Sequence, residues 1–342
     1  MFAITDILKY LPFSIVFVKT PSIITIFLYY LSILVLIIYF KKSSVKFMLY
    51  VKKNFIKIIC AILIIVMIFN FDFVDFNQYY HFVDVGQGDC IFIRTTYGKN
   101  LLIDGGEEEY GKNVVMPYLL DRGVSRIDYM IVSHFDSDHV GGLFYILKNM
   151  NVKNVLIGTQ YEDNKNFSDF LKLVKEKNIR LKMLKSGDNF TIDKSISMEV
   201  LWPPSKKMID ENSINNNSLV FKLINNDFSS LFTGDIEEIA EREILNYYKN
   251  DLKKLNSNII KVPHHGSKTS SSIAFIEAVQ PKVCIIGVGK KNKFGHPDDV
   301  VLERYKSINC KIYRTDEMGE ISIKKNASFL KKHSKVNIYT KL

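Results

Sequence analysis

Cysteine is scarce in this chain of 342 residues, which contains four. Cys60 lies inside a long apolar run, and the other three, Cys90, Cys284 and Cys310, lie in or beside shorter runs that resemble buried strands. No C-x-x-C pair occurs, and buried free thiols are ordinary in such segments. These features exclude a fold built on disulfides and indicate reduced, structural cysteines.

Histidine is also sparse, and no histidine lies between residues 140 and 263. The seven in the chain are His81, His134, His139, His264, His265, His296 and His333. Five of them lie in segments that end apolar runs, where strands would deliver them to a common edge. This distribution points to a shared site rather than to scattered core histidines.

Acidic residues are outnumbered, with 36 Asp and Glu against 46 Lys and Arg, which gives a formal net charge of +10. The lysines gather at residues 172–185, 253–254, 290–293 and 324–335. Clusters of this kind favour a polyanionic partner. Part of the excess belongs to residues 41–53, which we expect to lie away from such a partner.

Two long apolar runs stand near the N-terminus. Residues 21–40 carry no charge, and at about 1.5 Å per residue a helix of this length spans a bilayer core. Residues 54–71 form a second such run, with one lysine near its start. We predict two transmembrane helices, preceded by an interfacial or re-entrant segment at residues 1–20 that Pro12 interrupts.

The stretch between these runs, residues 41–53, carries five lysines and no acidic residue. By the positive-inside rule it is a cytoplasmic loop, which places everything after residue 71 outside the cytoplasm. A cleaved signal peptide is the alternative for the first run, but lysines rather than a small-residue cleavage site follow it. We therefore expect a protein of the cell membrane with an extracytoplasmic domain.

The densest group of metal-capable side chains lies in SHFDSDHVGG, residues 133–142, directly after an apolar run. These side chains are His134, Asp136, Asp138 and His139. If a strand runs out into a loop at the first histidine, residues two apart point the same way, and His139 follows from the turn. Imidazole and carboxylate suit zinc, manganese or iron, and four such groups exceed what one ion draws from one loop. We predict a site for two divalent ions; a solvated acidic loop is the alternative.

Four further motifs surround this segment in a fixed order: DVGQGD at 84–89, IDGG at 103–106, TGD at 233–235 and VPHHGS at 262–267. Together they resemble the metallo-β-lactamase fold, an α/β fold of αββα sandwich architecture. More narrowly, residues 79–325 resemble the C-terminal hydrolase-like domain of the ComEC/Rec2 competence proteins, which take up DNA. Residues 326–342 would then be a basic tail.

The expected elements fit this architecture. Strands at 80–85, 90–94 and 100–106, a helix at 114–122 and a strand at 129–132 make the first half. A helix at 143–149 follows the metal-capable segment. The later strands are expected at 154–157, 180–184, 196–201, 218–224, 228–233, 258–262 and 283–288, and the later helices at 166–177, 236–248 and 273–279.

The resemblance also assigns roles to side chains. It implies that Asp235 bridges two ions, with His134 and Asp136 on one ion and Asp138, His139 and His265 on the other. Of the adjacent pair at the end of a strand, we assign His265 to the metal and His264 to substrate binding or proton transfer. Asp84, Asp89 and Asp104 would support the site from outside, although turn capping is an equal alternative for the first two.

Substrate contacts are expected near the second half of the site. Hydroxyls and free amides at a helix start, with a lysine among them, form a phosphate site, which suggests Ser267, Lys268 and Thr269; a helix cap without ligand is the alternative. His296, in the basic loop 290–297, is expected to act as a general acid or to bind phosphate, or to be a structural loop residue. Asn217 lies in a polar loop that either lines the site or is merely solvated.

Two departures from the wider superfamily bear on the metal. Asp136 stands where H-x-H-x-D-H has its second histidine, and the mid-domain histidine ligand is missing. One half of the site is thereby richer in oxygen, which suits manganese at least as well as zinc. Asp138, His264 and His296 are the candidate catalytic residues, and two cations about 3.5–4 Å apart would stabilise the attacking and leaving oxygens at phosphorus.

The resulting hypothesis is a membrane-anchored, metal-dependent phosphodiesterase. The resemblance implies a nuclease that acts on DNA during competence, with single-stranded DNA as partner, and a separately encoded channel and uptake proteins beside it, because two helices cannot form a DNA-conducting pore. One alternative is an exported phosphodiesterase that acts on cell-wall polymer or phosphocholine esters. Another is a catalytically weak domain that binds DNA in an uptake complex.

Overall fold

The structure, a computed structural model, describes residues 77–159, 164–206, 208–326 and 336–341, together with scattered positions between residues 20 and 57. The chain divides into two compact units, one of Met1–Asp75 with Leu119–Val124 and the other of Phe76–Tyr118 with Ser125–Leu342. All the predicted site residues lie in the second unit.

The predicted membrane segments, residues 21–40 and 54–71, lie largely outside the described residues, as do the segment 1–20 and the loop 41–53. Several positions between Ile23 and Ile37 are described, and they are helical. Among the helices that the structure describes, none combines the length and the apolarity needed to cross a membrane.

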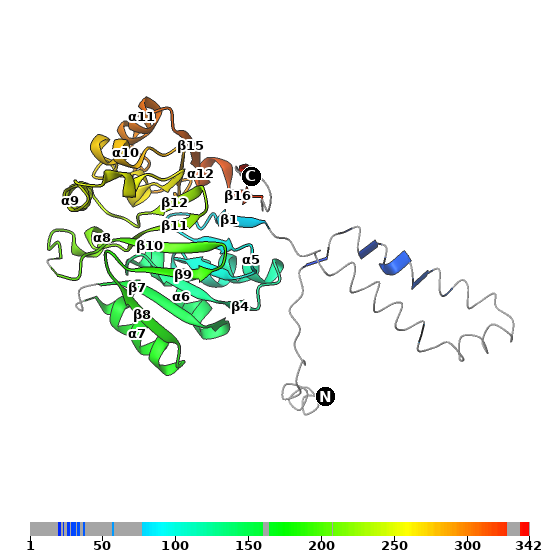
Figure 1. Ribbon diagram of the computed structural model, residues 1–342. Coiled ribbons are helices and arrows are strands. Elements are labelled where there is room, and N and C mark those ends of the chain that lie inside the picture. The colour runs from blue at the N-terminus through cyan, green and yellow to red at the C-terminus, as the bar shows by residue number, and fades with distance from the viewer. Residues whose placement is uncertain are drawn as a thin grey trace, which may run out of the picture. The chain divides into compact units, whose positions relative to one another are not determined.

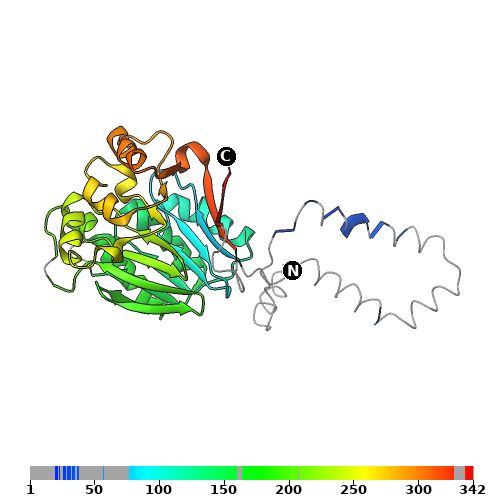
Figure 2. The same ribbon diagram turned by 45° about the horizontal axis from the view of Figure 1, so that its top comes forward.

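The first sheet of the second unit has the strand order β17-β16-β1-β2-β3-β5-β7-β8. Its strands are β1 (Gln78–Phe82), β2 (Ile91–Arg94), β3 (Asn100–Ile103), β5 (Tyr129–Val132), β7 (Asn154–Gly158), β8 (Arg180–Leu184), β16 (Glu320–Lys325) and β17 (Val336–Lys341). The run from β3 to β8 is parallel, whereas β16, β1, β2 and β3 pair antiparallel. The last strands thus lie beside the first ones, as Figure 2 shows.

The second sheet has the order β15-β14-β13-β12-β11-β10-β9. Its strands are β9 (Asn189–Asp193), β10 (Ile196–Trp202), β11 (Val220–Asn225), β12 (Phe228–Phe232), β13 (Ile259–Lys261), β14 (Val283–Ile286) and β15 (Lys311–Arg314). From β9 to β12 the pairing is antiparallel, and from β12 to β15 it is parallel. A small separate pair joins β4 (Arg126–Ile127) to β6 (Asn151–Val152).

Helices accompany both sheets. Those of the first half are α4 (Glu108–Tyr110), a π-helical turn (Gly111–Val115), α5 (Met116–Asp121), α6 (Ser137–Asn149) and α7 (Lys165–Glu176). Those of the second half are α8 (Ser213–Asn216), α9 (Glu238–Tyr247), α10 (Ile273–Val279), α11 (Asp299–Ser307) and α12 (Thr315–Met318), with 3-10 turns at Leu252–Leu255 and Pro263–Gly266.

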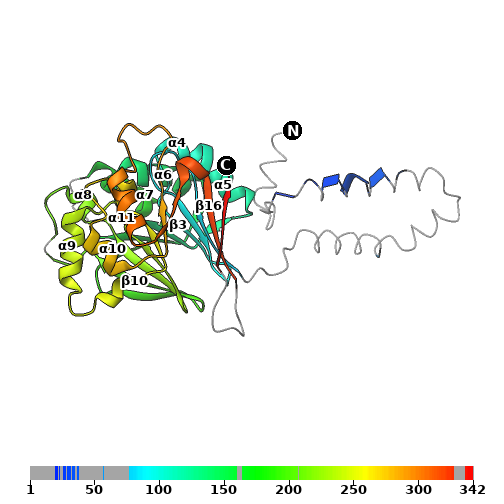
Figure 3. The same ribbon diagram turned by 90° about the horizontal axis from the view of Figure 1, so that it is seen from above.

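The two sheets face one another across a shared apolar core. Ile93 and Ile131 of the first sheet belong to the same buried cluster as Val200, Phe221 and Ile259 of the second. A second cluster joins the outer face of the second sheet to α9, α10 and α11, which lie together in Figures 1 and 3. Alternating inward residues explain this arrangement, because each strand of a sandwich offers every other side chain to the core.

On the other side of the molecule, α6 and α7 pack through aromatic rings. Phe135, just before α6, has its ring centroid 4.9 Å from that of Phe167 and 5.7 Å from that of Phe170. Phe144 lies 5.6 Å from Phe170. With helices outside both sheets (Figure 1), the predicted αββα architecture is confirmed.

Helix α6 begins earlier than the sequence predicted, at Ser137 instead of residue 143. Two glycines, Gly141 and Gly142, therefore lie inside the helix, where glycine is intrinsically unfavourable. Close backbone packing explains them, because a Cβ added at Gly142 would lie 2.0 Å from the carbonyl oxygen of Gly105. Asp138 and His139 are thereby in the first turn of a helix rather than in a loop.

Part of the segment predicted as a basic tail forms a strand. Residues 336–341 are β17, which pairs antiparallel with β16 at the edge of the first sheet. Every residue of β17 has a partner in β16, so the pairing with that strand stabilises it.

Candidate metal centre

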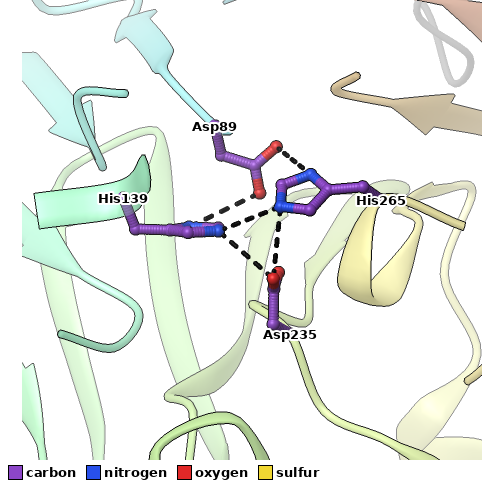
Figure 4. Close-up of side chains that lie close together, drawn as sticks. All are labelled: Asp89, His139, Asp235 and His265. Carbon is purple, nitrogen blue, oxygen red and sulfur yellow. Dashed lines mark hydrogen bonds and ion pairs between the residues drawn. The ribbon is translucent and has the colours of Figure 1, made fainter. Parts of the chain in front are cut away.

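Four buried side chains from distant parts of the chain point toward one another in Figure 4. Asp89 follows the turn after β1, His139 lies in α6, Asp235 follows β12, and His265 lies in the 3-10 turn after β13. One ligand atom from each lies within 4.8 Å of the others. The two halves of the sandwich thus meet in one group of metal-capable side chains.

The shortest contacts of this group involve the Nε2 atoms of two histidines. His139 Nε2 lies 3.2 Å from His265 Nε2, and Asp235 Oδ2 lies 3.3 and 3.2 Å from them respectively. Asp138 Oδ2 lies 3.4 Å from His265 Nε2. Two nitrogens and two carboxylate oxygens therefore converge, which is the mixed donor set that divalent zinc or manganese accepts.

The opposite nitrogen of each ring is held by an acceptor. His139 Nδ1 lies 2.9 Å from Asp104 Oδ2, and His265 Nδ1 lies 2.7 Å from the carbonyl oxygen of Gly287. Because a carboxylate and a carbonyl can only accept, both Nδ1 atoms donate, and in the neutral form of each ring the Nε2 lone pair faces the cluster. Outer partners of this kind orient metal-ligating histidines.

His134 carries a second indication of metal binding. Its ring is fully buried, and its Nδ1 lies 3.0 Å from Ser133 Oγ, which itself donates to Asp104 Oδ2 at 2.6 Å. His134 Nε2 has no hydrogen-bond partner among the described residues. A buried lone pair without a partner is costly, and a cation held there would satisfy it. The residues thus fit a metal.

Electrostatics in the cluster favour cations. Burial alone lowers the pKa of His265, but Asp235 and Asp138 together raise it to about 9. His139 behaves alike: burial opposes its charged form, yet Asp235 and Asp138 raise its pKa well above the usual value. Burial also raises the pKa of Asp235, but both histidines and Lys261 bring it well below its usual range.

The pKa of His134 is lowered, whereas those of His139 and His265 are raised. Burial, followed by the charge of His139, lowers its pKa to about 3. The ring is therefore neutral near pH 7, which is the form that binds a metal. Asp136 Oδ2 lies 3.8 Å from His134 Nε2, and the Asp136 side chain is 42% exposed. These two residues form a more open half of the site.

Lys261 is a member of the cluster that sequence reasoning missed. It ends β13, is 2% exposed, forms an ion pair with Asp89 and lies 3.5 Å from Asp235 Oδ1. Burial alone lowers its pKa, but these two carboxylates raise it above the usual value. The available signal was a lysine inside an apolar strand that leads directly into the histidine pair.

The three aspartates predicted outside the ligand set take different positions. Asp84 is exposed and accepts a hydrogen bond from Gly86 N at 3.0 Å, which is a turn contact. Asp104 holds His139 and Ser133. Asp89 belongs to the cluster of four, with its oxygens 3.8 and 3.9 Å from the Nδ1 atoms of His139 and His265; its supporting role stays a prediction.

His264 and His296, the two candidate proton donors, lie next to His265. The centroids of their rings are 5.8 Å apart, and the centroid of His264 lies 6.4 Å from that of His265. His264 Nδ1 lies 3.4 Å from Glu237 Oε1, and the His264 side chain is 22% exposed. Of the adjacent pair, His265 therefore points into the cluster and His264 points away from it.

The segment predicted to bind phosphate is held mainly by the chain's own acids. Ser271 N and Ser272 N, at the start of α10, donate to the buried carboxylate of Glu241 at 2.5 and 2.7 Å. Thr269 Oγ1 donates to Glu237 Oε1 at 2.8 Å, and Ser267 is buried. Lys268 is exposed. The substrate role of Ser267, Lys268 and Thr269 stays a prediction.

The polar loop before β11 is tightly bonded. Asn217 is fully buried, donates to the carbonyls of Ile209 and Ser213, and accepts from Ile209 N. These bonds hold the loop, and the substrate role of Asn217 stays a prediction. Nearby Asn215 is different, because its buried Oδ1 has no partner among the described residues. An amide oxygen of this kind is a further candidate ligand that sequence reasoning did not single out.

The chain is similar in part to a known protein family and to several known proteins. Residues 83–208 match the metallo-beta-lactamase superfamily. ComE operon protein 3 of Bacillus subtilis (strain 168) is 28% identical over 322 residues, which are 90% of this chain and 40% of that protein. Competence protein ComA of Neisseria gonorrhoeae is 29% identical over 238 residues, 70% of this chain and 31% of that protein.

Among solved structures, CmlA, a diiron β-hydroxylase from Streptomyces venezuelae, is similar with a TM-score of 0.45 and 14% identity, over 69% of this chain and 52% of that one. The present chain spans less than half of the curated relatives named above. It has homologues among competence proteins of the ComEC/Rec2 kind and contains a metallo-β-lactamase domain, as the motifs predicted.

Proposed function

We propose that this protein is a metal-dependent phosphodiesterase that hydrolyses DNA during competence. The observation that carries the proposal is the convergence of His139, His265, Asp235 and Asp138 on one point, inside a metallo-β-lactamase domain whose homologues are competence proteins. That domain and those homologues support a metal-dependent hydrolase in competence; the DNA substrate is the step that we add.

Two groups of side chains would hold the divalent ions, manganese or zinc. Asp138, His139, Asp235 and His265 form the closed group, and His134 with Asp136 forms the open one. Bound divalent ions lower the pKa of water and neutralise charge that develops on a phosphate. Asp235 would act mainly in the closed group, because its Oδ2 faces both histidines of that group while Lys261 holds its Oδ1.

The chain's own residues would supply orientation and proton transfer. Asp104 and the carbonyl of Gly287 keep Nε2 of both metal-facing histidines turned inward. His264 Nδ1 faces Glu237, so a proton held on its Nε2 is directed away from that acid. Hydrolysis joins water oxygen to phosphorus and breaks one P–O ester bond, and His264 or His296 would protonate the leaving oxygen.

The metal requirement is tested with the full chain on single-stranded DNA and on bis-para-nitrophenyl phosphate. We expect hydrolysis with Mn²⁺ or Zn²⁺, none with EDTA, and a loss above about a hundredfold in Asp235→Asn, because losing even an outer partner of a metal ligand costs about 10–100-fold. Asp251→Asn, at an exposed aspartate, is the matched control.

The outcomes separate the alternatives. Metal-dependent cleavage of both substrates supports the nuclease. Cleavage of the small ester without DNA cleavage contradicts it and favours a cell-wall phosphodiesterase. If the folded, metal-loaded protein cleaves neither substrate but binds DNA, the domain is a binding module.

We also propose that residues 21–40 and 54–71 cross the membrane and hold the hydrolase domain outside the cytoplasm, beside a separately encoded DNA channel. The five lysines of residues 41–53 support this orientation. The helical residues that the structure describes between Ile23 and Ile37 support a position in the membrane. Large apolar residues there are exposed, such as Ile23 at 85% and Phe27 at 64% of the residue surface.

A cysteine-labelling experiment tests this topology. Lys194→Cys in the domain and Lys46→Cys in the loop, each in a Cys60→Ser background, are treated in intact cells with an impermeant maleimide. We expect labelling of Lys194→Cys alone, and of Lys46→Cys only after permeabilisation. The reverse pattern would place the domain in the cytoplasm.

A further inference from the structure

The loop between β14 and α11 exposes one large aromatic ring. Phe294 is 57% exposed, and its ring stacks on that of His296, with centroids 5.8 Å apart and planes 16° from parallel. Lys293 Nζ lies 5.4 Å from the centroid of the Phe294 ring. A single exposed apolar residue is normal on a protein surface, so the meaning of Phe294 depends on how it is held.

Asn292 holds this loop in one conformation. Its Nδ2 donates to the carbonyls of Gly289 and His296 at 3.0 and 2.7 Å, and its Oδ1 accepts from the amides of Phe294 and His296 at 3.2 and 2.9 Å. Four hydrogen bonds from one side chain close the loop around it. The exposed ring is therefore presented by an ordered frame, which reduces the entropy lost when a ligand packs against it.

The same loop is attached to the metal cluster. Asp298 N donates to the carbonyl of Gly266 at 2.9 Å, next to His265. A line of rings leads from the cluster to the surface, with centroid separations of 6.4 Å from His265 to His264, 5.8 Å to His296 and 5.8 Å to Phe294. Two histidine rings, His264 and His296, thus lie between the Phe294 ring and His265 of the candidate metal centre.

The charges around the ring have one sign. Lys290, Lys291 and Lys293 are all exposed, and they flank Phe294 within the same loop. Exposed lysines beside an aromatic ring match the two parts of a single nucleic-acid strand, since the backbone is anionic and every base has a flat apolar face. A polymer without bases would use the lysines but not the ring.

We propose that Phe294, backed by His296, is a stacking platform for a nucleobase of single-stranded DNA next to the cleaved phosphate, with the loop lysines on the neighbouring phosphates. The inference rests on the proposed function and names its substrate class. It predicts a preference for single strands, because bases inside a duplex are already stacked on one another and cannot reach the ring.

The test compares Phe294→Ala with Phe294→Trp in the full chain. The substrates are a thymidine oligonucleotide, an abasic oligonucleotide of the same length and bis-para-nitrophenyl phosphate. We expect Phe294→Ala to weaken binding and raise KM for the thymidine strand about five- to a hundredfold, and Phe294→Trp to stay near wild type. The loss on the thymidine strand should exceed any loss on the abasic strand or the small ester at least about fivefold.

Tyr247→Ala is the matched control, because Tyr247 is an equally exposed aromatic residue, 58% exposed, on α9. We expect it to leave all three substrates unchanged. Equal losses in Phe294→Ala on the thymidine and abasic strands would overturn the proposal, and so would failure of Phe294→Trp to retain binding.

Anisotropy of a labelled thymidine strand without divalent metal separates the two hypotheses. If wild type hydrolyses nothing but Phe294→Ala still weakens thymidine binding selectively, the proposed activity fails and the stacking platform stands. If wild type cleaves DNA and Phe294→Ala binds and cleaves equally well, the activity stands and the platform is refuted.

Discussion

Lys261 is a buried cation beside the candidate metal site. Its ammonium group forms an ion pair with Asp89 and lies 3.5 Å from Asp235 Oδ1. Breaking a buried pair by removing one partner leaves an uncompensated charge. Lys261 therefore stabilises the metal-free protein and leaves Asp235 Oδ2 directed at the histidines.

This role predicts that Lys261→Met destabilises the metal-free chain by roughly 3–5 kcal/mol, the usual cost of breaking a buried pair. Added Mn²⁺ should restore more stability in this variant than in wild type, because an ion takes up the charge that Lys261 neutralised. Denaturant titration with and without Mn²⁺ measures both effects.

Lys222→Met is the control, since Lys222 is another buried lysine, 3.6 Å from Glu199. It should lower stability without changing the response to Mn²⁺. An equal response of the two variants to the metal would contradict the role assigned to Lys261.

Glu241 makes the stability of the folded protein depend on pH. Burial raises its pKa to about 7, against the hydrogen bonds from Ser272 and Ser271 that lower it. Between the ordinary pKa of 4.5 and 7 the folded state keeps a proton that the unfolded state has released. Raising the pH through this window therefore lowers the free energy of unfolding, by about 3 kcal/mol in total.

We expect Glu241→Gln to remove this slope, so that its stability relative to wild type rises as the pH goes from 4.5 to above 7. Denaturation curves over this pH range provide the measurement. Glu238→Gln, on the exposed face of the same helix, should follow wild type. A Glu241→Gln variant with an unchanged slope would show that another group controls the window.

At the scale of elements, the turn Pro263–Gly266 decides which histidine enters the cluster. His264 and His265 both have left-handed backbone angles, with φ of 47° and 53°. Gly266 follows with φ of 80°, and a Cβ added there would lie 2.6 Å from Pro297 Cβ. The contact with Pro297 thus joins the histidine turn to the loop that carries His296 and Phe294.

We expect Gly266→Ala to lower both the stability and the Mn²⁺ affinity of the protein, because the clash shifts the turn that positions His265. Gly98→Ala is the matched control, since Gly98 has φ of 74° and nothing within 4 Å of an added Cβ. That variant should lose only about 1–2 kcal/mol, the cost of a left-handed backbone. Metal titration of both proteins decides; equal affinities would show that the turn tolerates the shift.

At the scale of the whole molecule, the candidate metal centre draws its residues from both halves of the sandwich. His139 comes from α6, beside the first sheet, whereas Asp235 and His265 follow strands of the second. An ion bound by all three binds only the folded state, in which the two halves meet. Metal binding should therefore stabilise the whole domain rather than one loop.

We expect Mn²⁺ at a hundred times its Kd to add about 2.7 kcal/mol to the free energy of unfolding, which raises Tm by roughly 5–10 °C in a domain of this size. Asp235→Asn should remove the increase, and Asp251→Asn should keep it. Thermal melts at several Mn²⁺ concentrations give the result; a Tm independent of Mn²⁺ in wild type would mean that no ion bridges the halves.

Local patterns in the sequence determined the chemistry and the architecture of this protein. Apolar segments of strand length fixed the layers, because alternation and turn residues act over a few neighbours. The ordered motifs around His134, Asp235 and His265 indicated a metallo-β-lactamase domain with imidazole and carboxylate ligands. These features depend on residues close together in the chain.

Only the tertiary structure decided how distant side chains share the site. Which ring of the histidine pair faces inward depends on the left-handed turn and on its contact with Pro297. Asp89 and Lys261 come from different halves of the domain and form their ion pair only in the folded protein. The backbone amides at the start of α10 likewise bond to Glu241, which lies on another helix. Such contacts arise from packing across the sandwich, which no local pattern encodes.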